Sequence, residues 1–243
     1  MLLKKWEQLP PEMQTDTVRK YYDILKKKQV TLLFKRAFDI VGSFLLIILF
    51  LPLFLVLATA IKLDSKGPVF YRQVRVTQYN REFRIFKFRS MIQDADKGSL
   101  ITTQDDVRIT QIGRIIRRFR LDEISQLINV LKGDMTFVGT RPEVPKYVEH
   151  YTPEMMATLL LPAGVTSLAS ILYKDEAELL DTAEDTDKVY TEKVLPAKMY
   201  YNLKSIEKFN FWDDIRIMLM TVLAICSKEY TAVKKDEYDT IER

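Results

Sequence analysis

The segment IVGSFLLIILFLPLFLVLATAI, residues 40–61, decides which class of fold this chain can adopt. Its roughly 22 uncharged residues exceed the ~18 that indicate a membrane helix. A cleaved signal peptide is the competing interpretation, because Ala58 and Ala60 form an A-x-A pattern. However, the apolar run begins near residue 40 and is longer than the roughly 7 to 15 apolar residues of a signal peptide. The segment is therefore predicted to insert into a membrane.

The flanks and the centre of this segment bear on its topology. Basic residues stand on both sides, Lys35 and Arg36 before it and Lys62, Lys66, Arg72 and Arg75 after it. Because positive charge prefers the cytoplasmic side of a membrane, neither end is the obvious one to translocate. Pro52, near the middle, removes a helical hydrogen bond and kinks a helix. These features weakly favour a re-entrant helix broken at Pro52 over a helix that crosses the membrane, and they leave both open.

Composition narrows the chemistry. The chain has 243 residues and a formal charge of +4, which suits an anionic membrane surface or phosphorylated substrates and is too small to indicate nucleic acid. A single cysteine, Cys226, excludes an intramolecular disulfide and a thiolate zinc cluster, so a cytosolic face fits best. The one histidine, His150, is predicted to be solvated or structural. Because the seven glycines form neither a P-loop nor a dinucleotide-binding motif, bound phosphates would have to be held by arginines and a metal.

Residues 1–34 are predicted to contain an amphipathic helix that starts near Pro11. Apolar side chains recur there at loose helical spacing: Met13, Val18, Tyr21, Tyr22 and Leu25. Such a helix could pack on its own domain or lie on the membrane surface, and the sequence favours neither.

Two alternating runs, residues 69–77 and 81–90, are joined by QYN and predict a β-hairpin. Alternation places Phe83, Ile85, Lys87 and Arg89 on one face of the second strand and Arg84, Phe86 and Phe88 on the other. Two helices follow within residues 109–132 and stop at Gly133. The rest is predicted to be mostly helical, with an irregular interruption at 161–170 and a last amphipathic helix at 211–225. The predicted fold class is α/β, mostly helical with a small β-hairpin sheet.

Asp122 and Glu123 fall in the first turn of the second of these helices, directly after Arg117, Arg118 and Arg120. In one interpretation they only stabilise the helix N-terminus, by roughly 0.3–1 kcal/mol. In the other they do phosphate chemistry: arginine forks match phosphate oxygens, Mg²⁺ takes one or two carboxylates plus substrate phosphates, and a carboxylate can attack phosphorus. The acidic pair alone is a weak signal. Its combination with the membrane segment favours phosphate chemistry.

Four motifs in order resemble the bacterial sugar transferases, the monotopic polyprenol-phosphate phosphoglycosyl transferases. They are KRAFD (35–39), SKGPVFYRQVR (65–75), FKFRSM (86–91) and LDEISQLINVLKGDMTFVGTRPE (121–143), and the last is highly specific. The resemblance covers about residues 35–225. It implies transfer of a phospho-sugar from a UDP-sugar to undecaprenyl phosphate with release of UMP, as the first membrane step in assembling a capsule, exopolysaccharide, O-antigen or glycoprotein glycan. It also implies a monotopic protein of the bacterial cytoplasmic membrane, with a re-entrant helix broken near Pro52, membrane-surface amphipathic helices and a catalytic domain on the cytoplasmic face.

The resemblance also assigns roles to residues. In that family the aspartate of the Asp-Glu pair is the nucleophile and the glutamate helps to hold Mg²⁺, which would be Asp122 and Glu123. Family arginines that assist the phosphates match Arg117 and Arg141. Two further phosphate-binding candidates, Lys87 and Arg89, end a neighbouring strand.

Two motifs depart from the family pattern. Gly-Pro-Arg-Pro reads GTRP, with Thr140 in place of the first proline, and Pro-Gly-Ile-Thr-Gly reads PAGVTS at 162–167. These departures put the identity of the sugar in doubt and leave the catalytic assignment intact.

The chain is predicted to divide into an N-terminal amphipathic extension (1–34), a re-entrant membrane helix (35–62), a cytosolic catalytic domain (63–204) and a C-terminal amphipathic helix with a polar tail (205–243). The expected partners are a UDP-sugar, undecaprenyl phosphate and membrane lipid, with no nucleic acid. The oligomeric state stays open, with a homodimer among the options. A rival function is that of a non-enzymatic membrane adaptor whose basic helices bind anionic lipid. A third, a single-span protein with a basic nucleic-acid-binding domain, has no aromatic base-stacking motif to support it.

Overall fold

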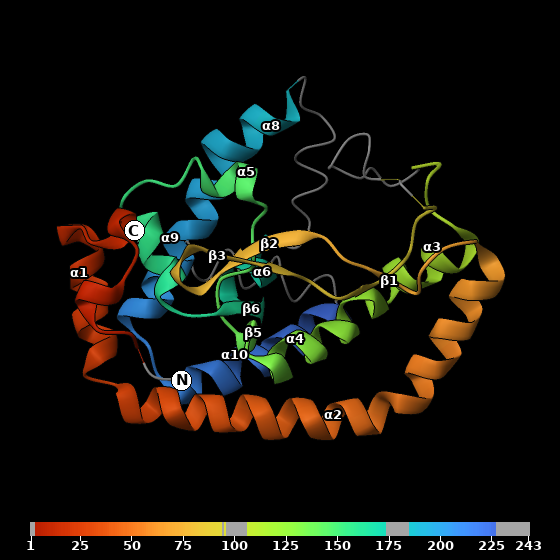
Figure 1. Ribbon diagram of the computed structural model, residues 1–243, viewed down its shortest axis with the longest axis horizontal. Helices are drawn as coiled ribbons and strands as arrows, with labels where there is room; N and C mark the ends of the chain where they lie inside the picture. The colour runs from red at the N-terminus through yellow and green to blue at the C-terminus, as the bar shows by residue number, and fades with distance from the viewer. Residues whose placement is uncertain (1–2, 94, 96–105, 174–184, 227–243) are drawn as a thin grey trace.

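The computed structural model describes residues 3–93, 95, 106–173 and 185–226. Within these ranges helices dominate and the sheets are small, each of two strands (Figure 1). The predicted class, mostly helical with little sheet, is confirmed. The polar tail predicted after Cys226 lies outside the described residues.

The helices and strands have the following bounds. The α-helices are α1 (Asp16–Lys26), α2 (Gln29–Asp64), α3 (Gln111–Arg118), α4 (Leu127–Lys132), α5 (Pro145–Val148), α6 (Leu168–Leu172), α8 (Thr186–Val189), α9 (Leu195–Glu207) and α10 (Phe211–Cys226). The strands are β1 (Phe70–Tyr71), β2 (Val74–Thr77), β3 (Arg81–Arg84), β4 (Lys87–Phe88), β5 (Met135–Val138) and β6 (Ala163–Thr166). Short 3-10 helices are η1 (Trp6–Gln8), η2 (Pro11–Met13), η3 (Gln78–Asn80), η5 (Leu121–Gln126) and η6 (Met155–Leu160), and η7 (Tyr190–Val194) is a π-helix.

α2 contains the apolar segment and is one continuous helix of 36 residues with Pro52 in its interior. Its ribbon runs along the bottom of Figure 1 and turns upward at the right, as expected of a helix with an internal proline. Its large apolar side chains are exposed over most of its length, for example Phe34 (69%), Leu49 (67%) and Leu55 (62%). Among the described residues it is the one helix long and apolar enough to cross a membrane, judged by length and composition.

The N-terminal part of α2 is fastened to the globular body by buried charges. Lys35 Nζ donates to the carbonyl of Val138 at 2.8 Å and to Asp214 Oδ2 at 2.6 Å. Asp39 accepts from Thr136 Oγ1 at 2.7 Å and from the backbone N–H of Phe137 at 3.1 Å. These contacts tie α2 to β5 and to α10.

The C-terminal end of α2 is fastened to the same body. Arg89 donates to the carbonyls of Ser65 at 2.7 Å and Ile61 at 3.4 Å and also to that of Lys66, so its guanidinium closes the C-terminal end of α2. Asp64 Oδ2 accepts from the backbone N–H of Ile112 at 3.0 Å, at the start of α3. The two ends of the apolar helix therefore meet one domain.

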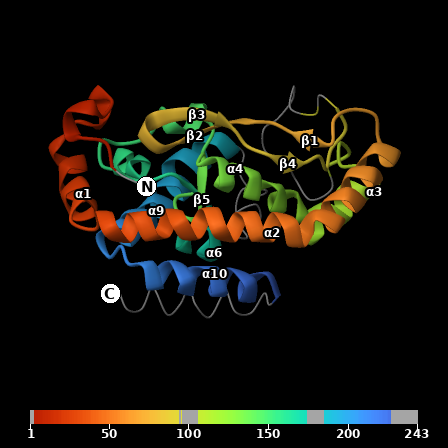
Figure 2. The same cartoon turned by 60° about the horizontal axis from the view of Figure 1, so that its bottom comes forward.

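α10 lies beside the first half of α2, and both run along the same side of the molecule (Figure 2). The rings of Phe38 and Phe211 meet edge to face, with centroids 5.5 Å apart. The predicted helix is confirmed as α10, but its exposed side also carries large apolar side chains: Ile217 and Met220 are buried against the domain, whereas Trp212 and Leu219 are 73% and 62% exposed.

The N-terminal helix packs on the domain. Val18, Tyr21, Tyr22 and Leu25 are buried in a cluster that also contains side chains from residues 148–161 and 206–209. This burial decides between the two placements that the sequence left open, because the apolar stripe of α1 is covered by protein.

The β-hairpin is confirmed in the predicted place. β2 pairs with β3 and β1 with β4 in one antiparallel register, with Thr77 opposite Arg81 and Tyr71 opposite Lys87. The predicted alternation also holds: Phe83 packs against the β5 side of the domain, and Phe88 packs against the C-terminal half of α2.

One feature of the sheets was not predicted. β5 and β6 form a parallel pair, with Met135 opposite Ala163, so the segment expected to be an irregular interruption contains a buried strand. The chain just after β5 also approaches β6 closely: a Cβ on Gly164 would lie 2.2 Å from backbone atoms of Gly139. Neither strand has more than four residues, which left too little pattern for the sequence to reveal them.

Candidate active site

Asp122 and Glu123 stand in the first turn of η5, as the sequence predicted. The chain enters this turn through Arg120, whose φ of 51° lies in the left-handed region. Such a conformation costs a non-glycine residue about 1 kcal/mol or more and is found often at functional sites. It separates η5 from α3, so that the two carboxylates begin a new helix.

Hydrogen bonds hold strand β4 beside this turn. Asn129 of α4 accepts from the backbone N–H of Phe86 at 2.8 Å and donates to the carbonyl of Arg84 at 3.1 Å. Ser125 of η5 donates to the carbonyl of Phe86 at 3.1 Å. Because Phe86 precedes Lys87 in the chain, these bonds fix Lys87 next to the acidic pair.

Cations from two elements meet the carboxylates. Lys87 Nζ lies 3.5 Å from Asp122 Oδ2 and 3.7 Å from Glu123 Oε1. Arg141, in the turn after β5, forms an ion pair with Glu123 Oε1 through Nη2, and its Nη1 donates to Oε2 at 3.4 Å. The side chains of Asp122 and Glu123 keep 17% and 18% exposure. They are thus shielded by protein and still accessible from a cavity.

The electrostatic setting of Glu123 favours its ionised form. Burial raises the pKa of this carboxyl, but the charges of Arg141 and Lys87 and the hydrogen bond from Arg141 outweigh burial and lower its pKa to about 2. Glu123 is therefore an anion throughout the physiological pH range.

The acidic pair lines a cavity of about 770 Å³ that lies over the hairpin and the ends of α3 and β5. Among its described lining residues, two carboxylates face eight cations: Arg72, Arg75, Lys87, Arg89, Arg108, Arg117, Arg120 and Arg141. Such an excess of positive charge fits a ligand with several phosphate charges. The volume falls in the usual range for small-molecule sites.

The four predicted phosphate-binding residues reach this cavity in different ways. Lys87 and Arg141 contact the carboxylates, and Arg117 lines the wall from the end of α3. Arg89 also lines the wall, but both terminal nitrogens of its guanidinium donate to carbonyls at the end of α2. Its observed contacts are those of a helix cap, and its binding of phosphate stays a prediction.

The family assignment follows from comparison with known proteins. The sequence profile described as bacterial sugar transferase matches residues 30–228. The chain belongs to this family.

Several curated relatives of this sugar transferase have named activities. The UDP-N-acetylgalactosamine-undecaprenyl-phosphate N-acetylgalactosaminephosphotransferase of Aeromonas hydrophila is 36% identical over 79% of the chain and 43% of that protein. A UDP-glucose:undecaprenyl-phosphate glucose-1-phosphate transferase of Caulobacter vibrioides is 34% identical over 80% of the chain and 70% of that protein. The uncharacterized sugar transferase EpsL of Bacillus subtilis is 30% identical over 87% of the chain and 96% of that protein.

The sugar transferase chain spans less than half the length of some of these relatives, including 43% of the Aeromonas protein and 40% of a Klebsiella pneumoniae glucose-1-phosphate transferase. The similarity therefore concerns the region that contains the apolar helix, the hairpin and the acidic pair.

Four arginines of this sugar transferase's cavity were not among the predicted phosphate-binding residues: Arg72, Arg75, Arg108 and Arg120. Arg75 donates to the carbonyl of Pro142 at 3.0 Å, next to Arg141, and Arg72 lies over the ring of Phe86 at 3.5 Å. The sequence does contain a signal for Arg75. The three-residue loop Gln78–Asn80 sets the hairpin register and so places Arg75 opposite Phe83, on the same face of the hairpin as Lys87. Sequence proximity alone assigns Arg72 and Arg75 to the basic flank of the apolar segment.

The donor set of this sugar transferase fits Mg²⁺ held partly by substrate. The described residues contain no group of three or more His, Cys, Asp or Glu side chains that could bind a metal on their own. Asp122 and Glu123 are adjacent carboxylates facing a cavity suited to phosphates, and Mg²⁺ is commonly held by one or two carboxylates together with substrate phosphates and water.

Proposed function

We propose that this chain transfers a sugar 1-phosphate from a UDP-sugar to undecaprenyl phosphate and releases UMP. The observation that carries the proposal is the accessible acidic pair, Asp122 and Glu123, in a cavity lined by eight cations. The names of several relatives, which combine a UDP-sugar donor with undecaprenyl phosphate, support the same reaction.

In the first half of the reaction Asp122 is the nucleophile. One oxygen of its carboxylate attacks the phosphorus that bears the sugar, and the bond from this phosphorus to the bridging oxygen breaks. The bridging oxygen keeps the electron pair and leaves as part of UMP. Asp122 then carries the sugar phosphate as an acyl phosphate.

In the second half a phosphate oxygen of undecaprenyl phosphate attacks the same phosphorus. The bond to Asp122 breaks, the carboxylate is restored, and the product is undecaprenyl diphosphate joined to the sugar. The charges balance when the acceptor reacts as a dianion, because two dianions enter the complete reaction and two leave. A general base is therefore not needed, which agrees with the absence of a histidine from the described cavity lining.

The cations organise the phosphates for both steps. Arg141 and Arg117 present guanidinium forks that match phosphate oxygens two at a time, and Lys87 neutralises charge beside the nucleophile. Glu123, with Asp122, would hold Mg²⁺, which supplies charge neutralisation at the diphosphate when bound. When the substrate phosphates engage Arg141, the oxygens of Glu123 become available to a metal.

We further propose that α2 enters and leaves the membrane on one side, with the catalytic cavity facing the cytoplasm. Lys35 at one end and Ser65 at the other contact the same globular body, and the apolar surface between them is exposed. A helix whose two ends are fastened to one domain is difficult to place across a membrane, and the basic flanks agree with a common cytosolic side.

A non-enzymatic adaptor that binds anionic lipid is the second candidate, and the basic exposed surface of α3 is compatible with it. An adaptor needs no cavity around its acidic pair and no cation held against it. Incubation of the purified chain with UDP-sugars, undecaprenyl phosphate and Mg²⁺, with UMP measured, tests the proposal. Repeated turnover to UMP that depends on the acceptor and on one UDP-sugar supports the transferase, and no UMP release with any UDP-sugar from a folded protein supports the adaptor.

A further inference from the structure

A second cavity, of about 250 Å³, lies between the end of β5, the C-terminal half of α9 and the first turns of α10. It shares no described lining residue with the catalytic cavity. Thr140 lines this pocket, whereas Arg141, the next residue, lines the catalytic cavity, so the two hollows lie on either side of the turn after β5.

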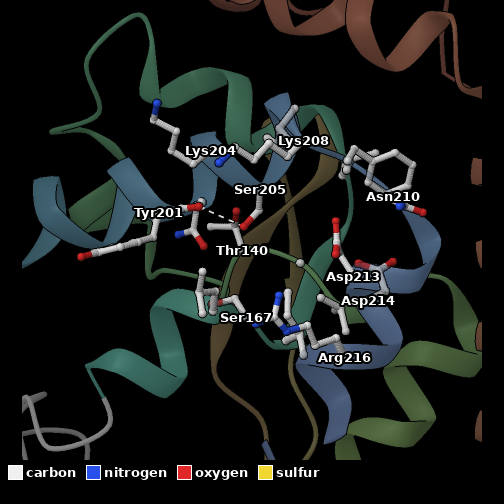
Figure 3. A pocket seen from close by; sticks show the side chains of 18 of the residues that line it. Thr140, Ser167, Tyr201, Lys204, Ser205, Lys208, Asn210, Asp213, Asp214 and Arg216 are labelled. Atoms are coloured by element: carbon white, nitrogen blue, oxygen red, sulfur yellow. Dashed lines mark hydrogen bonds between the residues drawn. The ribbon is translucent and has the colours of Figure 1, made fainter. Parts of the chain in front are cut away.

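Cations face this pocket from two directions. Lys204 and Lys208 lie on one side and Arg216 on the opposite side, with Thr140 and Ser205 between them (Figure 3). The side chain of Arg216 makes no ion pair or hydrogen bond with the part of the chain that the structure describes. Lys204 Nζ lies 3.8 Å from Glu207 Oε2. Because this ion pair is partly exposed to solvent, it is weak, and Lys204 can still interact with a ligand.

Two carboxylates also line the pocket. Asp214 is already paired with Lys35 at 2.6 Å, so its charge is compensated. Asp213 is exposed, in the first turn of α10, and opposes only part of the positive charge. The pocket therefore has a net attraction for an anion.

The pocket lies beside the exposed apolar surface of α10 and α2. On α10 the helical spacing places Arg216 beside Trp212, Leu219 and Leu223, which are 73%, 62% and 50% exposed. α2, whose apolar side chains are also exposed, lies next to α10 (Figure 2). A cation at the edge of an apolar face that meets a membrane lies at the depth of the lipid phosphates.

The walls of the pocket are suited to an amphiphile. Apolar side chains line it beside the cations, including Ile206, Phe209, Ile217 and Met220. The hydroxyl groups of Ser167 and Ser205 also line the pocket, where Ser205 Oγ donates to the carbonyl of Tyr201 at 3.0 Å and Ser167 Oγ pairs with Ser170 Oγ at 2.9 Å. This combination matches a phosphate that carries a glycerol backbone and acyl chains.

We propose that this pocket binds the phosphate of an anionic glycerophospholipid and so holds α10 and the turn after β5 at the membrane surface. The inference rests on the membrane arrangement proposed above and is independent of the catalytic step. The site would make the stability of the protein depend on membrane composition.

The test uses the full chain in nanodiscs of phosphatidylcholine, with or without phosphatidylglycerol, and without UDP-sugar or acceptor. Phosphatidylglycerol should raise the midpoint of thermal unfolding, and a photoreactive phosphatidylglycerol should cross-link to residues lining the pocket. Lys208→Gln combined with Arg216→Gln should lose most of the midpoint shift and reduce cross-linking about five-fold or more. Arg216→Lys, which keeps the charge, should retain part of both signals.

A matched control removes two charges elsewhere. Lys188 and Lys193 are exposed and do not line the pocket, so Lys188→Gln combined with Lys193→Gln should keep both signals. No phosphatidylglycerol effect in the wild type, or equal effects in both double variants, would overturn the proposal. An equal shift from inorganic phosphate in neutral nanodiscs, with the same dependence on Lys208 and Arg216, would overturn the choice of lipid. UMP release is measured separately, so loss of activity with intact lipid signals counts against the proposed function alone.

Discussion

Glu123 is kept ionised by two cations that approach it from different parts of the chain, Lys87 from β4 and Arg141 from the turn after β5. The acidic pair, Lys87, Arg117 and Arg141 were predicted from the sequence, and the structure brings them to one cavity. Arg89 has a helix-capping position that its place in a basic motif did not reveal. Arg72 and Arg75 escaped prediction because a hairpin register, not sequence proximity, brings them to the site.

The lowered pKa of Glu123 gives a pH-dependent prediction. Its pKa falls from 4.5 to about 2 on folding, so the carboxylate contributes stability above pH 4.5, which is lost as the pH falls toward 2. Glu123→Gln should destabilise the protein at pH 7 by about 1 to 2 kcal/mol, less than for a fully buried pair. In thermal unfolding in detergent, the difference in stability between the wild type and Glu123→Gln should disappear as the pH falls from 4.5 to 2. Glu149→Gln, at an exposed position, is the control, and a gap that persists unchanged at pH 2 would contradict the assignment.

Arg141→Lys tests the need for a fork. Lysine keeps the charge but binds one oxygen where arginine binds two, so UMP release should fall about ten-fold or more while membrane association is unchanged. Arg114→Lys, on an exposed arginine of α3 outside the described cavity lining, should behave as wild type. Unchanged turnover in Arg141→Lys would assign Arg141 to a structural role in its turn.

At the scale of elements, local pattern decides what could be predicted. The hairpin was predicted because alternation and a short polar loop are contiguous in the sequence, and α10 because its apolar side chains recur over four turns. The β5–β6 pair was missed because parallel strands join distant segments and each is only four residues long. α2 was predicted as a helix from its composition, whereas the buried contacts of Lys35 and Asp39 depend on partners far along the chain.

The close approach of β6 to the turn after β5 predicts the cost of adding a single methyl group at Gly164. A Cβ at Gly164 would lie 2.2 Å from backbone atoms of Gly139, which cannot yield as a side chain can, so Gly164→Ala should destabilise by about 3 kcal/mol or more. Gly133→Ala meets only the end of Arg36 but must adopt a φ of 89°, which should cost about 1 to 2 kcal/mol. Thermal unfolding of both variants tests whether Gly164→Ala is the more destabilising substitution. Equal costs would show that Gly139 and Gly164 can move apart without penalty.

At the scale of the whole molecule, an exposed apolar helix is held at both ends by one domain. The sequence predicted the apolar helix, but it could not decide where the N-terminal helix lies, because an apolar stripe is the same whether protein or lipid covers it. The division into four functional segments stays a prediction, since buried clusters join side chains across its boundaries.

The anchoring of α2 predicts its topology. In a Cys226→Ser background, cysteines at the exposed positions Lys27 and Lys66 should both resist a membrane-impermeant thiol reagent in intact cells and react after the membrane is opened. Lys188→Cys on the globular domain is the control for a cytosolic position. Labelling of either flank from outside intact cells, with the control protected, would establish that α2 crosses the membrane.

The most direct test of the central claim is the intact mass of the protein after incubation with its UDP-sugar and Mg²⁺ in the absence of undecaprenyl phosphate. If Asp122 is the nucleophile, the mass increases by one sugar phosphate, which peptide analysis maps to Asp122 and which is removed when undecaprenyl phosphate is added. Asp122→Asn should give no adduct and no turnover while remaining folded, because asparagine is nearly isosteric with aspartate and Asp122 lies within η5, whose N-cap is Arg120. UMP release that requires both substrates together, with no adduct under any quench, would contradict the account and leave Asp122 and Glu123 as metal ligands alone.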